Sequence, residues 1–311
     1  MKTRSVTLTA AVLLAALTVA PQAGQKPSGP AGTREALAVL DRMIEAMGGR
    51  KALEAIKDMT VTGTVEACEL GLTSPFVLYQ KEPDKMRMDI TVAEASLTIT
   101  QAFDGRRGWG TDDRSLVPEP MPERESRDMA RKALGNAALL SPRALGIAYA
   151  LKPKETSGGK DYTVLEQTLA DGHKVLFFID PETRLPAKLA TRTLGPAGAE
   201  GEAETFLSDY REFCGVRMAT VSRTLFDGKE VQRLTVAGVT CNSRLEDALF
   251  EHPSISMAVV IGVPHQAWGE TVILSDGDVV FQPRKVQRSG LWEAVEGRVL
   301  IYIHKEQMLD E

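Results

Sequence analysis

The feature of this sequence that most restricts its fold is a change of hydrophobic period near Met59. Before it, apolar residues recur every three or four positions behind Thr33, which is typical of an amphipathic helix ending near Gly48. After it, apolar and polar residues alternate, most cleanly in Lys85–Val92. A period of two gives a sheet one apolar face, so the pattern predicts an antiparallel sheet with N-terminal helices on that face.

The same alternation predicts four strands in the first part of the chain and six in the second. Between the two groups, residues 123–151 are expected to be helical, in two helices divided at Pro142. This order predicts an α+β fold and excludes an alternating parallel one. The strands are expected around 61–65, 76–80, 85–92, 97–103, 162–167, 174–180, 185–192, 205–213, 217–226 and 231–240.

The first residues have the pattern of a secretory signal peptide. Lys2 and Arg4 precede an apolar run over 6–20, and small or turn-forming residues follow up to Gly24. The run is shorter than the roughly 20 residues that span a bilayer. We therefore expect a signal peptide over 1–23, a linker over 24–32, and a periplasmic or otherwise exported protein that is soluble after cleavage.

The net charge of the chain limits the kinds of partner that it can bind. The net charge of −5 argues against a nucleic-acid surface, which needs clustered basic residues.

The three cysteines are Cys68, Cys214 and Cys241. The strand pattern places one strand between Cys214 and Cys241, roughly 10 Å at sheet spacing, whereas a disulfide needs a Cα separation of about 4.4–6.8 Å. Buried free thiols are therefore expected.

Four short motifs follow one another in a characteristic order. They are the run Tyr79-Gln80-Lys81-Glu82-Pro83-Asp84-Lys85-Met86-Arg87-Met88, then Phe103-Asp104-Gly105 with Trp109, then Asp209-Tyr210-Arg211 with Gly215-Val216, and finally Asn242, Asp247, Phe250 and Pro253. Together they resemble the periplasmic lipoprotein-carrier superfamily over about residues 33–253. One position departs from the family: its dedicated carriers have a lid-tethering arginine before the strand's proline, and this chain has Glu82.

The resemblance implies a curved, incompletely closed antiparallel β-barrel over 33–253, with N-terminal helices and a helical lid from 123–151. It implies a periplasmic carrier that shelters acyl chains of a lipid or an acylated protein, received from or given to a membrane-bound donor or acceptor, without a chemical step or cofactor. The alternative is a structural envelope module, because an ordinary filled core shows the same alternation. The candidate cavity lining is Met86, Met88, Ile90, Leu97, Ile99, Phe103 and Trp109, and the candidate lid is Met129, Ala133, Leu134 and Leu140.

A second resemblance covers only about residues 244–273, which are similar to the C-terminal subdomain of AMP-forming acyl-CoA synthetases. The phosphate loop and the adenylation lysine of those enzymes have no counterpart here, so an enzyme fragment is the less favoured alternative. Residues 254–311 are expected to be an appendage without a function of its own. The four histidines are widely spaced and no nucleophile motif is present, so no catalytic or metal-binding residue is predicted.

Overall fold

The computed structural model describes residues 32–111, 117–195, 198–253, 273–276 and 299–302. The expected signal peptide, the linker up to residue 31 and most of the expected appendage lie outside the described residues. The chain divides into two compact units, 1–251 and 252–311. In the second unit, strands β14 (Ile273–Asp276) and β15 (Val299–Tyr302) pair in parallel.

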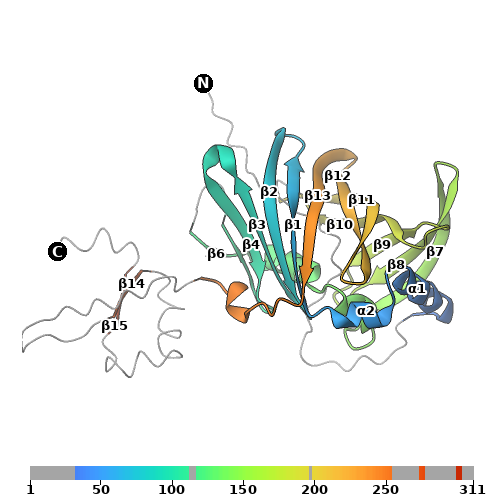
Figure 1. The fold of residues 1–311 in the computed structure, drawn as a ribbon, viewed down its shortest axis with the longest axis horizontal. Coiled ribbons are helices and arrows are strands. Elements are labelled where there is room, and N and C mark those ends of the chain that lie inside the picture. Colours follow the sequence, from blue (N-terminus) through green and yellow to red (C-terminus); the bar gives the residue numbers. More distant parts are fainter. Residues whose placement is uncertain (1–31, 112–116, 196–197, 254–272, 277–298, 303–311) are drawn as a thin grey trace, which may run out of the picture. The chain divides into compact units, whose positions relative to one another are not determined.

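A single 13-stranded sheet forms the first unit, and each neighbouring pair of strands is antiparallel (Figure 1). The sheet is curved but open, since its two outer strands, β6 and β7, do not pair with each other. All ten strands expected from the sequence are present. In sheet order the strands are β6 (Glu119–Pro120), β5 (Gly108–Gly110), β4 (Leu97–Phe103), β3 (Lys85–Val92), β2 (Leu72–Lys81), β1 (Asp58–Ala67), β13 (Lys229–Cys241), β12 (Val216–Phe226), β11 (Glu200–Phe213), β10 (Pro186–Leu194), β9 (Lys174–Ile179), β8 (Lys160–Thr168) and β7 (Ala148–Ser157).

Two helices precede the sheet, α1 (Arg34–Ala46) and α2 (Arg50–Ala55). The Thr33 hydroxyl caps α1 by accepting a hydrogen bond from the Ala36 N–H at 3.2 Å. Gly48, which follows α1, has a φ of +124°, and a Cβ there would clash with the Gly215 carbonyl oxygen. Only glycine fits this approach, which holds the end of α1 against the turn between β11 and β12.

The helical segment is shorter than predicted, and it breaks at a different residue. Helices α3 (Glu123–Ala133) and α4 (Ala137–Leu140) are separated at Gly135, whose φ is +46°, and not at Pro142. The prediction of helix up to residue 151 is wrong, because Ala148 begins β7 and Tyr149 pairs with Gln167 of β8. Residues 142–146 form a turn, and the strand begins only at Ala148.

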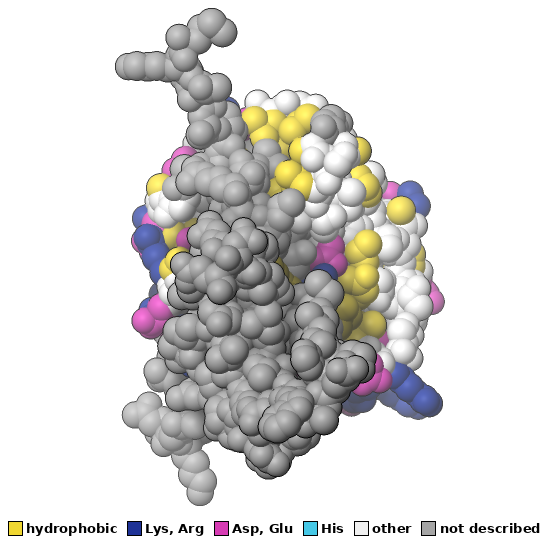
Figure 2. Space-filling model, turned by 90° about the vertical axis from the view of Figure 1, so that its left-hand side faces the viewer, with side chains coloured by type: hydrophobic (Ala, Val, Ile, Leu, Met, Phe, Trp, Pro, Cys, Tyr) yellow, Lys and Arg dark blue, Asp and Glu magenta, His cyan; other side chains and the backbone are white. Residues whose placement is uncertain are grey.

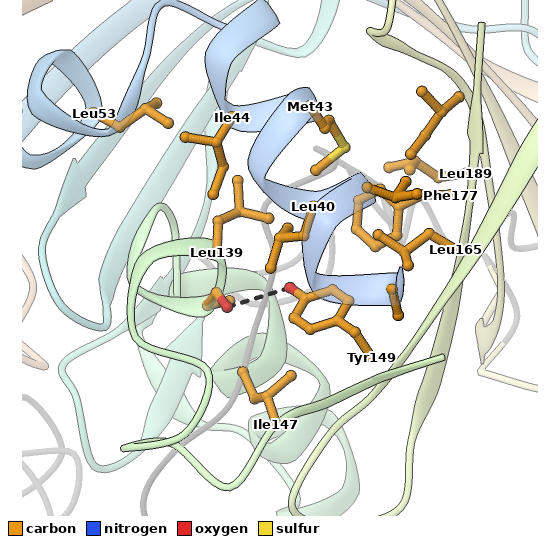
Figure 3. Packing of buried hydrophobic residues seen from close by; sticks show 14 of the residues in the cluster. Leu40, Met43, Ile44, Leu53, Leu139, Ile147, Tyr149, Leu165, Phe177 and Leu189 are labelled. Atoms are coloured by element: carbon orange, nitrogen blue, oxygen red, sulfur yellow. Dashed lines mark hydrogen bonds between the residues drawn. The ribbon is translucent and has the colours of Figure 1, made fainter. Parts of the chain in front are cut away.

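The core consists of two clusters on the face of the sheet that carries the helices, called here the inner face. In the first cluster, α1, α2 and α4 pack on β7 to β10, and Figure 3 shows Leu40 and Met43 of α1 directed at sheet residues. In the same view the Tyr149 hydroxyl donates to the Ala138 carbonyl oxygen at 3.3 Å. In the second cluster, α3 packs on β1 to β4. Burial of these apolar side chains is the main stabilising contribution, at about 25 cal/mol per Å².

Cys214 and Cys241 form a disulfide, so the prediction that they are free thiols is wrong. Their Cα atoms are 6.4 Å apart. Cys214 lies in the turn that leads into β12, and β12 is a direct neighbour of β13, which ends at Cys241. No strand separates the two residues, because Cys214 lies before the first residue of β12, beside the end of β13. Cys68 is a half-buried free thiol.

Residues 242–250, called here the closing segment, run from β13 across the ends of several strands. The Asp58 carboxylate accepts hydrogen bonds from the backbone of Ser243 and Arg244 at 2.7 and 3.0 Å. Lys81 donates to the Leu245 carbonyl oxygen at 2.7 Å. Phe250 is fully buried. The first residues of the synthetase-like stretch thus belong to the first unit, whereas residues 254–272 of that stretch lie outside the described residues.

Candidate functional site

The predicted lining residues of β3 and β4 share the inner face. Directly opposed residues of a sheet point to the same side, and Met86 opposes Phe103 while Ile90 opposes Ile99. Met86, Met88, Ile90 and Phe103 are buried in the second cluster, and α3 covers that cluster. Leu97, opposite Val92, is half-buried on this face, and Ile99 is buried.

Trp109 lies on the other face of the sheet. It opposes Ala102, which opposes Arg87, so all three point away from the Met86 side. The Trp109 indole N–H donates to the Phe250 carbonyl oxygen at 2.8 Å, and the Arg87 guanidinium lies 5.7 Å from its ring centroid. Trp109 therefore anchors the closing segment on the outer face and does not accompany the six other predicted lining residues.

The four predicted lid residues connect the two clusters. Met129 and Ala133 of α3 belong to the second cluster, whereas Leu134 belongs to the first. Leu140 of α4 is half-buried against the first cluster. The helical segment therefore crosses from one cluster to the other over the inner face.

Between the two clusters the inner face is incompletely covered. Five apolar side chains there are half-buried, although the register directs them inward with the buried Val61 and Leu234. Met59 touches both clusters, two of the others touch the first cluster, and two touch the second. We call this strip the seam, and it consists of Met59 of β1, Leu207 of β11, Met218 of β12, and Val236 and Val239 of β13. Sequence reasoning missed the seam, because a β-bulge beside Gly63 shifts the register and interrupts the alternation of β13.

Polar contacts hold α3 over the sheet. The buried Asp128 carboxylate accepts hydrogen bonds from Thr193 of β10 at 2.9 Å and from Lys132 at 2.7 Å. Arg131 pairs with Asp171 of the β8–β9 turn at 2.7 Å. Burial acts to raise the pKa of Asp128, but the charge and hydrogen bond of Lys132, the hydrogen bond of Thr193 and the charge of Arg131 together outweigh it, so this pKa lies below its ordinary value. The ionised form of Asp128 thus stabilises the packing of α3 on the sheet.

Glu82 contacts the junction of α3 and α4 from the end of β2. Its carboxylate accepts a hydrogen bond from the Asn136 N–H at 2.8 Å. Burial raises the pKa of Glu82 to about 7, although the N–H groups of Asn136 and Ala137 and the charge of Lys57 act in the opposite direction. A carboxyl group that follows β2 therefore makes the contact to the helical segment.

Three further features of the described residues concern exposed hydrophobic side chains, membrane-spanning helices and metal-ligating groups. Figure 2 shows hydrophobic side chains reaching the surface of the molecule in several places. The large hydrophobic residues that are most exposed are Val117 and Leu151. Among the described residues no helix is long and apolar enough to cross a membrane, and no group of three or more metal-ligating side chains occurs.

No family model and no curated protein matches the sequence. Among solved structures, the chain is similar to a DUF1329 family protein from Desulfovibrio piger, with 16% identity over 70% of this chain and 97% of that one and a TM-score of 0.48. It is also similar to a LolA superfamily protein from Nitrosomonas europaea, with the same identity, coverage and TM-score. A putative outer membrane lipoprotein-sorting protein domain from Vibrio parahaemolyticus matches with 14% identity over 69% of this chain and 95% of that one, and a TM-score of 0.48. Likeness at this level assigns no ligand to this chain.

Proposed function

We propose that this chain is an exported binding protein that shelters the acyl chain of a lipid or of an acylated protein in the seam, without a chemical step. The observation that supports the proposal is the half-burial of five inward-facing apolar side chains between two filled clusters. An inward apolar surface that its own helices leave partly open is suited to a guest of the same polarity.

The free energy gained by burying an acyl chain in the seam is large enough for binding. Each buried methylene contributes about 0.8 kcal/mol, so ten methylenes in the seam contribute roughly 8 kcal/mol before the cost of association. Met59 and Met218 lie on either side of the β13 valines, and methionine side chains repack around guests of different shape. The seam is therefore expected to select acyl chains by their length and to accept acyl chains of different shape.

We place the guest in the seam and not under α3. There, Met86, Met88 and Phe103 already pack against Met129 and Ala133 in the closed arrangement. A guest under α3 would have to displace that helix and separate Asp128 from Thr193. The seam needs no such displacement.

Export is part of the proposal. The sequence begins with the pattern of a signal peptide, and a disulfide between Cys214 and Cys241 suits an oxidising compartment. A membrane-bound donor or acceptor would supply and remove a guest of this kind.

Lipid extraction and mass spectrometry of the protein purified from cells test the proposal. We expect acyl chains to accompany the wild-type protein and to be depleted in Val236→Phe, which fills the seam. The control is Thr235→Phe, which adds a similar ring at the neighbouring, exposed position on the outer face. Absence of acyl chains from the wild-type protein, or equal loading of both variants, would contradict acyl-chain binding in the seam and would favour a filled structural module.

A further inference from the structure

A buried amide without a hydrogen-bond partner lies beside the seam. Gln80 of β2 shares the inner face with Leu78, and its side chain is only 2% exposed. The amide nitrogen is shielded from water and has no hydrogen-bond partner among the described residues. An unpaired donor of this kind is unfavourable, because it has lost its hydrogen bonds to water and gained none from protein. A ligand that brings an acceptor to this nitrogen would offset that cost.

Gln80 is the direct neighbour of the seam residue Met59. The two residues oppose each other in the ladder of β1 and β2, and the Cβ atoms of opposed residues lie about 5 Å apart. Met59 is half-buried and touches both clusters. Its unbranched side chain has three rotatable bonds and can turn aside for a guest. A ligand in the seam therefore meets the amide at the edge that Met59 forms.

The junction between α3 and α4 covers the amide on the side of the helices. Gly135 lies between the two helices, and an added Cβ there would clash with the amide nitrogen of Gln80 and with a carboxylate oxygen of Glu82. The two side-chain groups therefore lie close together in the space that the glycine leaves free. The edge of the seam at Met59 thus carries an unpaired donor next to a carboxyl group.

The neighbouring carboxyl group determines which ligand group suits the donor. Glu82 is ionised at pH 8, because its pKa is about 7. Lys57 and Asp84 act on Glu82 with charges of opposite sign, so the group as a whole is negatively charged. The carboxylate of a free fatty acid would be repelled there, whereas the carbonyl oxygen of an ester or an amide is a neutral acceptor. The arrangement therefore favours an acyl ester or an acyl amide.

We propose, building on the function proposed above, that Gln80 donates a hydrogen bond to the ester or amide carbonyl of an acylated ligand whose chain lies along the seam. On binding, Met59 turns aside and the carbonyl oxygen takes its place next to the amide. The acyl chain then follows β13 past Val239 to Val236, which opposes Gly63 of β1. Four residues of β1 separate Met59 from Gly63, which is about 13 Å at strand spacing.

The experiment compares two ligands on the delipidated full chain at pH 8, monolauroylglycerol and ionised laurate, by displacement of a fluorescent fatty-acyl probe. Wild-type protein is expected to bind the ester about 5- to 10-fold more tightly than laurate, as for one hydrogen bond. Gln80→Met keeps the volume and removes the donor, so we expect it to lose about 5- to 10-fold in ester affinity and to bind laurate unchanged.

Two further variants test the position of the donor and the charge beside it. Gln232→Met is the matched control, because Gln232 lies on the inner face beyond the buried Leu234, and we expect it to keep the preference of wild-type protein for the ester. Glu82→Gln removes the negative charge beside the donor, so we expect it to bind laurate more tightly than wild-type protein does. A loss of the ester preference in Gln232→Met equal to that in Gln80→Met would overturn the assignment to Gln80.

The outcomes separate this inference from the function on which it rests. If wild-type protein binds neither ligand, the carrier function itself fails. If both ligands bind equally and Gln80→Met changes neither affinity, the carrier function stands and the role of Gln80 is overturned. The midpoint of thermal unfolding gives a second readout, which we expect Gln80→Met to leave equal or raise, because the described residues give this donor no partner. A lowered midpoint with equal loss of both affinities would show a structural amide and overturn the inference.

Discussion

The contact between Glu82 and the helical segment predicts a specific dependence of stability on pH. The pKa of Glu82 is about 7 in the folded protein, against an ordinary value of 4.5. Below pH 4.5 the carboxyl group is protonated in both the folded and the unfolded chain and contributes nothing to the pH dependence. As the pH rises from 4.5 through 7, the unfolded chain ionises first, so the folded state loses stability.

The magnitude follows from the two pKa values. A difference of one pH unit corresponds to about 1.4 kcal/mol, so full ionisation of Glu82 lowers the free energy of unfolding by roughly 3 kcal/mol. Glu82→Gln removes the charge and keeps an oxygen that accepts from the Asn136 N–H. We therefore expect this variant to equal wild-type protein at pH 4.5 and to exceed its free energy of unfolding by about 2–3 kcal/mol at pH 8.

Urea unfolding at the two pH values measures this difference, with the disulfide kept intact. Carboxyl groups that do not interact with Glu82 titrate alike in both proteins and cancel in the comparison, whereas the charge of Asp84 helps to raise the pKa of Glu82 and is therefore part of the measured effect. Glu212→Gln on β11 serves as the control, since this side chain is exposed. The reasoning is refuted if Glu82→Gln changes the free energy of unfolding by the same amount at both pH values.

Two further predictions concern the disulfide and the closing segment. Replacing both Cys214 and Cys241 with serine opens a loop with a sequence separation of 27, and we expect a loss of about 3–4 kcal/mol in the free energy of unfolding; an unchanged urea midpoint would contradict a disulfide in the native protein. Trp109→Phe keeps an aromatic ring but removes the donor to the Phe250 carbonyl oxygen. We expect a loss of about 1–2 kcal/mol and faster hydrogen exchange in residues 242–250, whereas exchange unchanged in that segment would show that Trp109 does not hold it.

The strands could be predicted because their signal is local. Lys85–Val92 alternates without interruption, and the structure buries its apolar side as predicted. The face of Trp109 could not be predicted in the same way, because β5 has three residues and so carries too little alternation to fix a side. The prediction of free thiols failed because it counted strands, whereas Cys214 lies in a turn.

The candidate site was harder to predict than the sheet. Periodicity shows that Met86 and Met88 share an apolar face, but it carries no information on which part of that face a helix covers. Coverage depends on where α3 and α4 separate, which is at Gly135, where an added Cβ would clash with the side chains of Gln80 in β2 and of Glu82 just after it. Contacts between residues so far apart in sequence leave no local pattern.

The sheet order also has a consequence for how the chain acquires its fold. Strands β1 and β13 are neighbours in the middle of the sheet, with Met59 opposite Cys241, so the ladder that unites the two halves joins opposite ends of the first unit. The hairpins of each half form from nearby residues, but the central ladder waits until β13 has been synthesised. Long-range pairing of this kind slows folding and leaves strand edges open in the meantime. A nascent chain of this protein therefore completes this sheet only after β13, the last strand of the sheet, has been synthesised.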